Sequence, residues 1–216
     1  MFFKAVFLHI LLLIANIEAD GYETKSYVED DTLQKIEKKY DSDAKNRFIN
    51  LQSKLDSVKD ESVFEKLDVV NKFYNEVKYA SDIDVYNLKD YWATPLEFLS
   101  RYKGDCEDYV ISKYFALKYL NVDKKKLFFT YVRSTKFKTP HMVLTYFETP
   151  TSEPLILDNT THTISSASQR KDLTPIYNFN GEHFFKAAKT GAGKKLKHKP
   201  HKKWEQLKQN MKRNKI

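Results

Sequence analysis

Hydrophobic residues in the first half of the chain recur at helical spacing. One set follows Asp31 and Thr32, either of which can cap a helix, and a second set begins at Val63. Polar residues at 41–43 interrupt the first set. An apolar residue at every third or fourth position forms one face of an amphipathic helix, so we expect an N-terminal helical lobe whose apolar faces build the core. The two sets are Leu33, Ile36, Tyr40, Phe48, Leu51 and Leu55, and Val63, Phe64, Leu67, Val70, Phe73, Tyr74 and Val77.

Two further helices are predicted on either side of residue 104. Thr94 can cap the first, Pro95 suits its first position, and Glu97 completes a capping box. That helix should end near Gly104, which can adopt a positive φ and turn the chain. A second helix is expected from Asp105 onward. Its apolar spacing comes from Tyr109, Ser112, Tyr114, Phe115, Leu117 and Leu120.

The spacing changes to that of a sheet after the three lysines at 124–126. Residues 127–132 read as a strand, His141 opens the apolar run 142–147, and the run 155–157 leads into Asp158. The last two runs flank a turn with two prolines and therefore predict an antiparallel hairpin. If its centre lies between residues 149 and 150, His141 stands directly opposite Asp158 on one face, with Cβ atoms ~5 Å apart.

Length and charge divide the 216-residue chain into three expected parts. Residues 1–19 are predicted to be a signal peptide, residues 20–185 a single domain with its own core, and residues 186–216 a basic, flexible tail. The tail holds eleven Lys and one Arg against one Glu, so it carries +11 and the remainder −3 of the net charge of +8. Nucleic acid is not an expected partner, because no basic or aromatic platform is evident within the domain.

The two ends of the chain each leave an alternative open. Lys4, the apolar stretch 5–17 and Ala19 resemble a secretory signal peptide, whose apolar run is shorter than the ~20 residues of a spanning helix. Cleavage after Ala19 would release an exported protein, and an uncleaved N-terminal anchor is the alternative. In the tail, Trp204, Leu207 and Met211 could form a basic amphipathic helix that contacts an anionic membrane or envelope polymer. Sparse apolar content favours a solvated tail instead.

Cys106 is the only cysteine, and three carboxylates flank it in the run Gly-Asp-Cys-Glu-Asp-Tyr. A lone thiol cannot form an intramolecular disulfide, and acidic neighbours argue against an inert, dry pocket. The first turn of a helix favours a thiolate, because its unpaired amides and dipole lower a cysteine pKa. Cys106 is therefore a candidate nucleophile.

His141 and Asp158 complete a candidate catalytic triad with Cys106. In this interpretation Cys106 attacks a carbonyl, His141 takes and returns the proton, and Asp158 orients the imidazole. The Cys106 amide is the first candidate for an oxyanion donor, and Tyr91 or Trp92 is the second. Four other histidines, His162, His183, His198 and His201, lie in predicted loops or the tail, and no zinc-like spacing accompanies the cysteine.

The segments around these residues resemble the LapG-type bacterial transglutaminase-like cysteine proteinases. The resemblance covers about residues 63–183 and includes segments before and after the triad, all in the order of the family. The segments are VNKFYN at 70–75, DYWATPLE at 90–97, GDCEDY at 104–109, HMVL at 141–144, LDN at 157–159, SQRKDL at 168–173 and PIYNFN at 175–180.

This resemblance implies an α+β, papain-like or transglutaminase-like fold, with an N-terminal helical lobe packed on an antiparallel sheet. It implies a periplasmic, calcium-dependent endopeptidase that clips the N-terminal region of a large biofilm adhesin and is inhibited by a cyclic di-GMP receptor in the inner membrane. The positions that match the family's calcium ligands are Asp105 and Glu107. Calcium prefers more oxygen ligands than two carboxylates provide, so backbone, water or another segment must supply the rest.

Two other functions use the same residues. A transglutaminase would transfer the acyl group from glutamine to an amine through the same triad, and a binding module on this fold would leave the triad unused. The basic tail at 186–216 is not recognised as part of the family.

Overall fold

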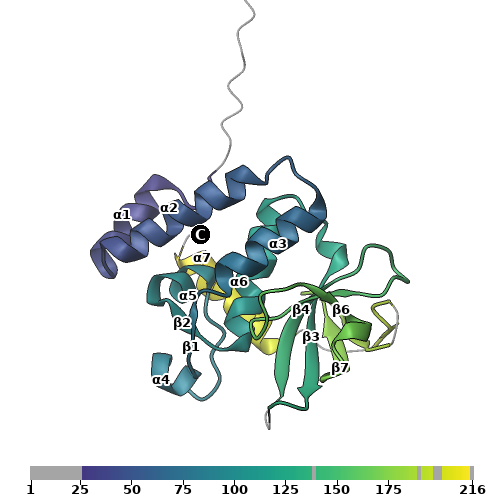
Figure 1. Cartoon of the computed structure of the whole chain (residues 1–216). Coiled ribbons are helices and arrows are strands. Elements are labelled where there is room, and N and C mark those ends of the chain that lie inside the picture. The colour runs from purple at the N-terminus through teal and green to yellow at the C-terminus, as the bar shows by residue number, and fades with distance from the viewer. Residues whose placement is uncertain (1–25, 138–139, 189–190, 197–200, 215–216) are drawn as a thin grey trace, which may run out of the picture.

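The computed structural model describes residues 26–137, 140–188, 191–196 and 201–214 (Figure 1). The expected signal peptide at 1–19 lies outside the described residues. Helices account for most of the described residues in the first half of the chain, as the hydrophobic spacing predicts. They are α1 Asp30–Lys39, α2 Ser42–Ser57, α3 Val63–Tyr74, α4 Asp82–Tyr86, α5 Pro95–Arg101, α6 Cys106–Tyr119 and α7 Lys202–Asn214, with 3-10 turns at Lys124–Lys126 and Ala167–Gln169.

Side-chain caps explain where several of these helices begin. Asp41 separates α1 from α2 and accepts a hydrogen bond from the Ala44 amide at 2.6 Å. Thr94 and Glu97 form the predicted capping box of α5. Such contacts satisfy backbone amides that have no partner within the helix. The caps are local in sequence, and the predicted break at 41–43 and start of α5 are confirmed.

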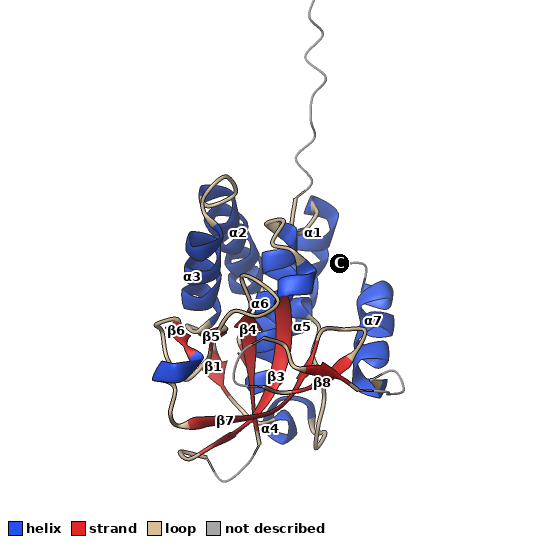
Figure 2. Ribbon diagram, turned by 90° about the vertical axis from the view of Figure 1, so that its right-hand side faces the viewer, coloured by secondary structure: helices blue, strands red, loops and turns tan. Residues whose placement is uncertain are grey.

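A seven-stranded sheet forms the second half of the domain (Figure 2). Its order is β6-β5-β4-β3-β7-β8-β9, and all neighbouring strands are antiparallel. Two short strands, β1 Lys78–Tyr79 and β2 Lys103–Gly104, pair in parallel apart from this sheet. The strands of the large sheet are β3 Leu127–Ser134, β4 His141–Tyr146, β5 Leu155–Leu157, β6 Ser165–Ser166, β7 Leu173–Phe179, β8 Phe184–Lys186 and β9 Lys194–Lys195.

Helix α6 occupies the centre of the molecule, between α3 and strand β4 (Figure 1). It is buried on nearly all sides, from Cys106 at its first residue to Leu117 near its end. A helix that is apolar all round requires packing partners on every face. The fold therefore places Cys106 on the most enclosed helix of the domain, at the end that meets the sheet. The α+β arrangement predicted from sequence is confirmed.

The turn between α5 and α6 differs from the prediction. Tyr102, not Gly104, adopts the left-handed conformation at the end of α5, with φ of 55°. Gly104 is needed for a different reason: a Cβ atom there would approach the Phe98 ring to 2.6 Å and would collide with the Asp108 carboxylate. Close packing, rather than a positive φ, accounts for glycine at this position.

Part of the expected C-terminal tail forms a helix, α7. Helix α7 packs against the domain, where Trp204 and Leu207 are buried (Figure 2). The Trp204 ring lies 5.3 Å from Phe129 and 5.7 Å from Phe179 between centroids. One tryptophan and one leucine provide enough apolar area to hold a short amphipathic helix, although its outer face carries several lysines.

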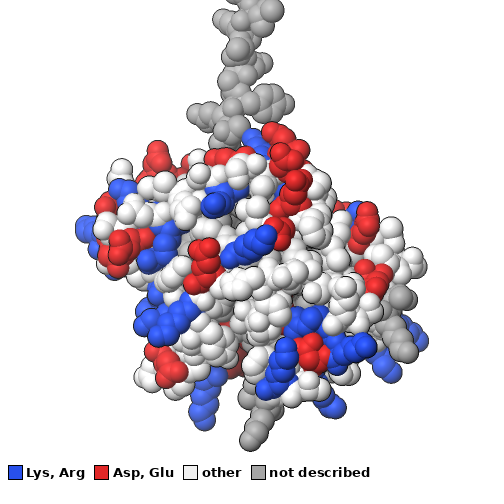
Figure 3. Space-filling view, in the orientation of Figure 1, with Lys and Arg blue, Asp and Glu red and all other residues white. Residues whose placement is uncertain are grey.

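Charged side chains are interspersed over the face of the molecule shown in Figure 3. Acidic and basic groups alternate across the helical lobe and the sheet edge, a distribution typical of a solvated surface. Among the residues that the structure describes, no helix combines the length and apolar character required to cross a bilayer.

Candidate active site

His141 and Asp158 meet at the end of the β4–β5 hairpin. The His141 Nε2 atom lies 2.9 Å from Asp158 Oδ1, and both side chains are buried. The strand pairing places Leu144 opposite Leu157, so the hairpin centre lies one residue later than predicted and His141 is not directly opposite Asp158. The two still share one face because the pairing is displaced by two residues, and side chains alternate with a period of two.

Besides His141, Thr160 and Arg170 also form hydrogen bonds with Asp158. Its Oδ1 accepts from the Thr160 amide at 3.0 Å, and its Oδ2 accepts from the Thr160 hydroxyl and from Arg170 Nη2, both at 2.8 Å. Burial alone would raise the pKa of Asp158, but the His141 contact and the Thr160 hydrogen bonds outweigh it and hold the pKa below its usual range. The carboxylate is thus ionised and fixed in orientation.

Cys106 begins α6 and is 8% exposed. Its thiol donates to Glu107 Oε2 at 2.8 Å. Burial raises the pKa of the Cys106 thiol well above its usual value, and the Glu107 carboxylate adds to this, while the Met142 amide opposes it. The expectation of a lowered pKa is therefore wrong for this structure, because desolvation and a neighbouring anion exceed the effect of the helix N-terminus.

A pocket of about 300 Å³ brings Cys106 and His141 to one surface. Asp158 is not a lining residue, whereas its successors Asn159 and Thr160 are. Tyr91 and Trp92 are not among the lining residues, and the Tyr91 hydroxyl contacts Glu97 instead. The remaining lining residues are Tyr79, Phe137 and Pro140. Tyr79 was not predicted from the sequence, because the pairing of β1 with β2 is what brings it near Cys106.

Three carboxylates gather near the start of α6. Asp82, Asp105 and Asp108 each offer an oxygen within 4.8 Å of the others. Each also has a buried oxygen with no hydrogen-bond partner in the described structure: Asp82 Oδ1, Asp105 Oδ1 and Asp108 Oδ2. Asp105 was predicted as a ligand from family resemblance, whereas Asp82 was not. Glu107, the other predicted ligand, lies outside this group and contacts the Cys106 thiol.

The chemistry of this acidic group fits a cation. Burial raises the pKa of Asp105 to about 10, and the charges of Glu107, Asp108 and Asp82 add to the effect. Burial likewise raises the pKa of Asp108 and of Asp82. Buried carboxylate oxygens that face one another without donors are strongly unfavourable unless protonated or bound to a cation. Hard oxygen ligands of this kind suit Ca²⁺.

Comparison with known proteins connects this geometry to a family. The family model described as bacterial transglutaminase-like cysteine proteinase (BTLCP) matches residues 34–173. The chain belongs to this family. It is accordingly a cysteine proteinase with a transglutaminase-like fold. No curated protein matches the chain significantly.

Solved structures of Legionella pneumophila LapG resemble this proteinase over most of both chains. The calcium-bound form is 37% identical, covers 85% of this chain and 99% of its own, and superimposes with a TM-score of 0.73. The EGTA-treated form is 36% identical, covers 87% of this chain and 100% of its own, and gives a TM-score of 0.74. The family resemblance inferred from the sequence segments is confirmed.

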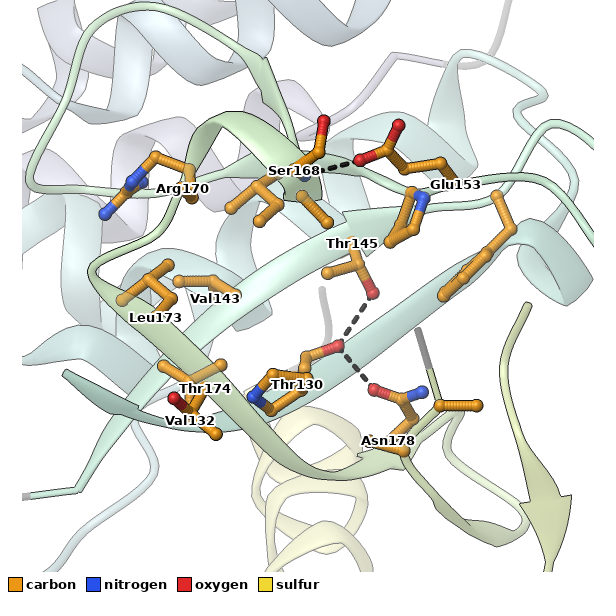
Figure 4. Close-up of a pocket in the computed structure, with 17 residues that line it drawn as sticks. Thr130, Val132, Val143, Thr145, Glu153, Ser168, Arg170, Leu173, Thr174 and Asn178 are labelled. Atoms are coloured by element: carbon orange, nitrogen blue, oxygen red, sulfur yellow. Dashed lines mark hydrogen bonds between the residues drawn. The ribbon is translucent and has the colours of Figure 1, made fainter. Parts of the chain in front are cut away.

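Arg170 of the proteinase is a residue that sequence reasoning did not single out. Its guanidinium bridges Asp158 and Asp172, with Nη2 at 2.8 Å and 2.9 Å from their respective oxygens. It also lines a separate cavity of about 500 Å³ on the sheet, which contains neither Cys106 nor His141 (Figure 4). In that cavity the Thr130 hydroxyl is hydrogen-bonded to the Thr145 hydroxyl and to Asn178 Oδ1. Only the fold brings Arg170 to Asp158.

Arg170→Met is expected to lower kcat/KM for peptide hydrolysis by on the order of 10- to 100-fold, because Asp158 loses the group that fixes its second oxygen. Methionine retains much of the apolar stem and therefore the local packing. Arg133→Met, at an exposed position of β3, is the matched control. Steady-state kinetics of both variants provide the measurement, and full activity of Arg170→Met would mean that Thr160 suffices to hold Asp158.

Proposed function

We propose that this proteinase is an exported, calcium-dependent endopeptidase that cleaves the N-terminal region of a large cell-surface biofilm adhesin. The observation that carries the proposal is the shared pocket of Cys106 and His141, with His141 held by Asp158 at 2.9 Å. The high similarity to LapG over the whole length of that protein supports it. The periplasm is the proposed compartment, reached through the signal peptide at 1–19.

The proposed reaction is hydrolysis through a thioester. Cys106 Sγ attacks the peptide carbonyl as its proton passes to His141, and the C–S bond forms. His141 then gives the proton to the leaving amine as the C–N bond breaks. Water, deprotonated by His141, attacks the thioester, and the carboxylic acid leaves as Cys106 recovers its proton. The Cys106 amide at the start of α6 is the proposed oxyanion donor.

Asp158 has a supporting role in this reaction. Its hydrogen bond to Nε2 leaves Nδ1 as the imidazole nitrogen available for proton exchange with Cys106. The buried carboxylate also stabilises the imidazolium formed during attack. The same residues would serve a transglutaminase, so the nature of the acyl acceptor decides between the two reactions.

Asp82, Asp105 and Asp108 are the residues proposed to hold calcium, and their unpaired buried oxygens support this. Glu107 stays a proposed ligand on family resemblance alone. Bound calcium would supply positive charge beside the start of α6, where four carboxylates otherwise gather around one thiol. A calcium-bound form of LapG supports the choice of metal.

Calcium is expected to raise the thermal unfolding temperature of the proteinase. At a free concentration of 100 times Kd, binding to the folded state alone adds about 2.7 kcal/mol, which corresponds to roughly 5–10 °C for a chain of this size. Asp108→Asn should abolish most of this shift, because it removes a buried ligand charge. Asp60→Asn, at an exposed turn, is the control. Calorimetry with calcium and with a chelator measures the shift in unfolding temperature. A shift in Asp108→Asn equal to that of the wild type would mean that the metal binds elsewhere.

The proposed partners follow from the family resemblance and from the basic C-terminal segment. An inner-membrane receptor for cyclic di-GMP is the proposed inhibitor. The lysines on the outer face of α7 are available to an anionic membrane or envelope polymer.

Incubation with the N-terminal region of a repeat-rich exported adhesin from the same organism tests the proposal. A new N-terminus, found by sequencing of the fragments and lost with a chelator, would support calcium-dependent proteolysis. Incorporation of a labelled amine without a new N-terminus would identify a transglutaminase. Binding of the adhesin segment with neither product would indicate a binding module.

A further inference from the structure

Lys113 is a fully buried lysine that the proposed reaction does not use. It lies on α6, two turns after Cys106, and is 0% exposed. Its Nζ atom is 2.8 Å from Asn71 Oδ1 and 2.6 Å from Asn75 Oδ1. Burial lowers the pKa of Lys113 to about 7. Even the neutral amine keeps two N–H donors, one for each amide oxygen.

The two asparagines connect α3 to the loop that carries Asp158. Asn75 Nδ2 donates to the backbone carbonyl of Asp158 at 2.8 Å and to that of Thr161 at 2.7 Å. Asn71 Nδ2 donates to the carbonyl of His162 at 3.2 Å. Three backbone carbonyls of residues 158–162 are therefore held by two amide groups.

Lys113 determines which way these amides point. An ammonium group only donates, so the Asn71 and Asn75 oxygens must face it. Their NH₂ groups must then face the loop, and Asn75 uses both of its amide hydrogens there. One buried amino group that donates to both oxygens thus fixes the orientation of two amides, and through them the backbone of the loop.

The loop itself belongs to the active site. Asp158 orients His141, while Asn159 and Thr160 form a wall of the pocket that contains Cys106. We propose that Lys113, Asn71 and Asn75 are positioning residues, which lock the loop at 158–162 against the helix that carries the nucleophile. The inference rests on the proposed hydrolytic function. In that function, the three residues keep the Asp158 carboxylate aligned with the His141 imidazole.

Asn75→Asp separates positioning from simple stability. The substitution is isosteric and keeps an acceptor for Lys113, with which it can form an ion pair, but it removes both donors to the loop. We expect kcat for adhesin cleavage to fall by on the order of 10- to 100-fold, with KM changed less than about twofold. Asn50→Asp, on the exposed face of α2, is the matched control.

Asn71→Asp and Lys113→Met extend the test. Asn71→Asp removes one donor, which contacts His162 farther from Asp158, so its fall in kcat should be smaller than that of Asn75→Asp. Lys113→Met removes the group that orients both amides and should lower kcat at least as much as Asn71→Asp. An equal effect of Asn71→Asp and Asn75→Asp would contradict a role that acts through Asp158.

A spectroscopic measurement keeps the inference independent of proteolysis. In a Cys106→Ala background, the imidazole proton shared with Asp158 should give a downfield ¹H NMR signal, which Asn75→Asp should broaden or abolish and Asn50→Asp should retain. An unchanged signal in a folded Asn75→Asp protein would overturn the inference. A wild-type protein that retains the signal but cleaves no adhesin would instead contradict the proposed function.

Discussion

Cys106→Ala is expected to abolish peptide-bond hydrolysis, with a loss on the order of 10⁶-fold in kcat. Cys106 is the only sulfur nucleophile in the chain, and it shares the pocket with His141. Alanine leaves His141 and Asp158 in place, so any residual rate would come from binding and oxyanion stabilisation alone. The measurement is the appearance of a new N-terminus in the adhesin segment over time.

Ser112→Ala is the matched control for this loss. Ser112 lies on the same helix, is fully buried, and has a hydroxyl with no hydrogen-bond partner in the described structure. Like Cys106→Ala, this replacement removes a single side-chain atom from α6, but Ser112 does not line the pocket. Cleavage that continued at the wild-type rate in Cys106→Ala would show that another group is the nucleophile.

Trp204→Ala is expected to lower the free energy of unfolding by about 3–5 kcal/mol, the range for loss of a large buried aromatic side chain. The indole ring contacts Tyr114 and Phe115 of α6 and Phe129 and Phe179 of the sheet, with centroid distances of 5.3–6.0 Å. Its removal leaves a cavity among rigid rings. Urea denaturation, with the midpoint and slope fitted together, provides the measurement.

Lys212→Ala on the same helix is the control, because Lys212 is exposed and its loss should change stability by less than about 0.5 kcal/mol. Similar midpoints for Trp204→Ala and the wild type would mean that α7 adds nothing to the fold in solution. The stability change of Trp204→Ala should occur without a change in the pH dependence of cleavage, since α7 contributes no group to the pocket of Cys106 and His141.

Features that depend on neighbours in sequence could be predicted. The capping box of Thr94 and Glu97, the break at Asp41 and the helix at Cys106 follow from local hydrogen bonding and apolar spacing. The shared face of His141 and Asp158 was also predicted, because alternation in a strand constrains it. Their exact pairing was not, since the prolines of the turn do not determine its centre.

Features that depend on distant segments could not be predicted. Arg170 reaches Asp158 only through the path of the chain after β6, and Asp82 reaches Asp105 only because β1 pairs with β2. The packing of Trp204 likewise requires rings from α6, β3 and β7. The raised pKa of the Cys106 thiol could not be predicted either. Burial and the Glu107 contact depend on the fold, whereas the position of Cys106 at a helix N-terminus is evident from the sequence.

The hydrogen bond between Cys106 and Glu107 bears on how readily the thiol is oxidised. Peroxides and disulfides react with the thiolate, and an enclosed thiol that donates to a carboxylate exposes very little of it. In an oxidising compartment this arrangement slows conversion to sulfenic acid or to a mixed disulfide with small thiols. The thiol is thereby kept reduced until a substrate carbonyl enters the pocket, where His141 is the proposed acceptor of its proton.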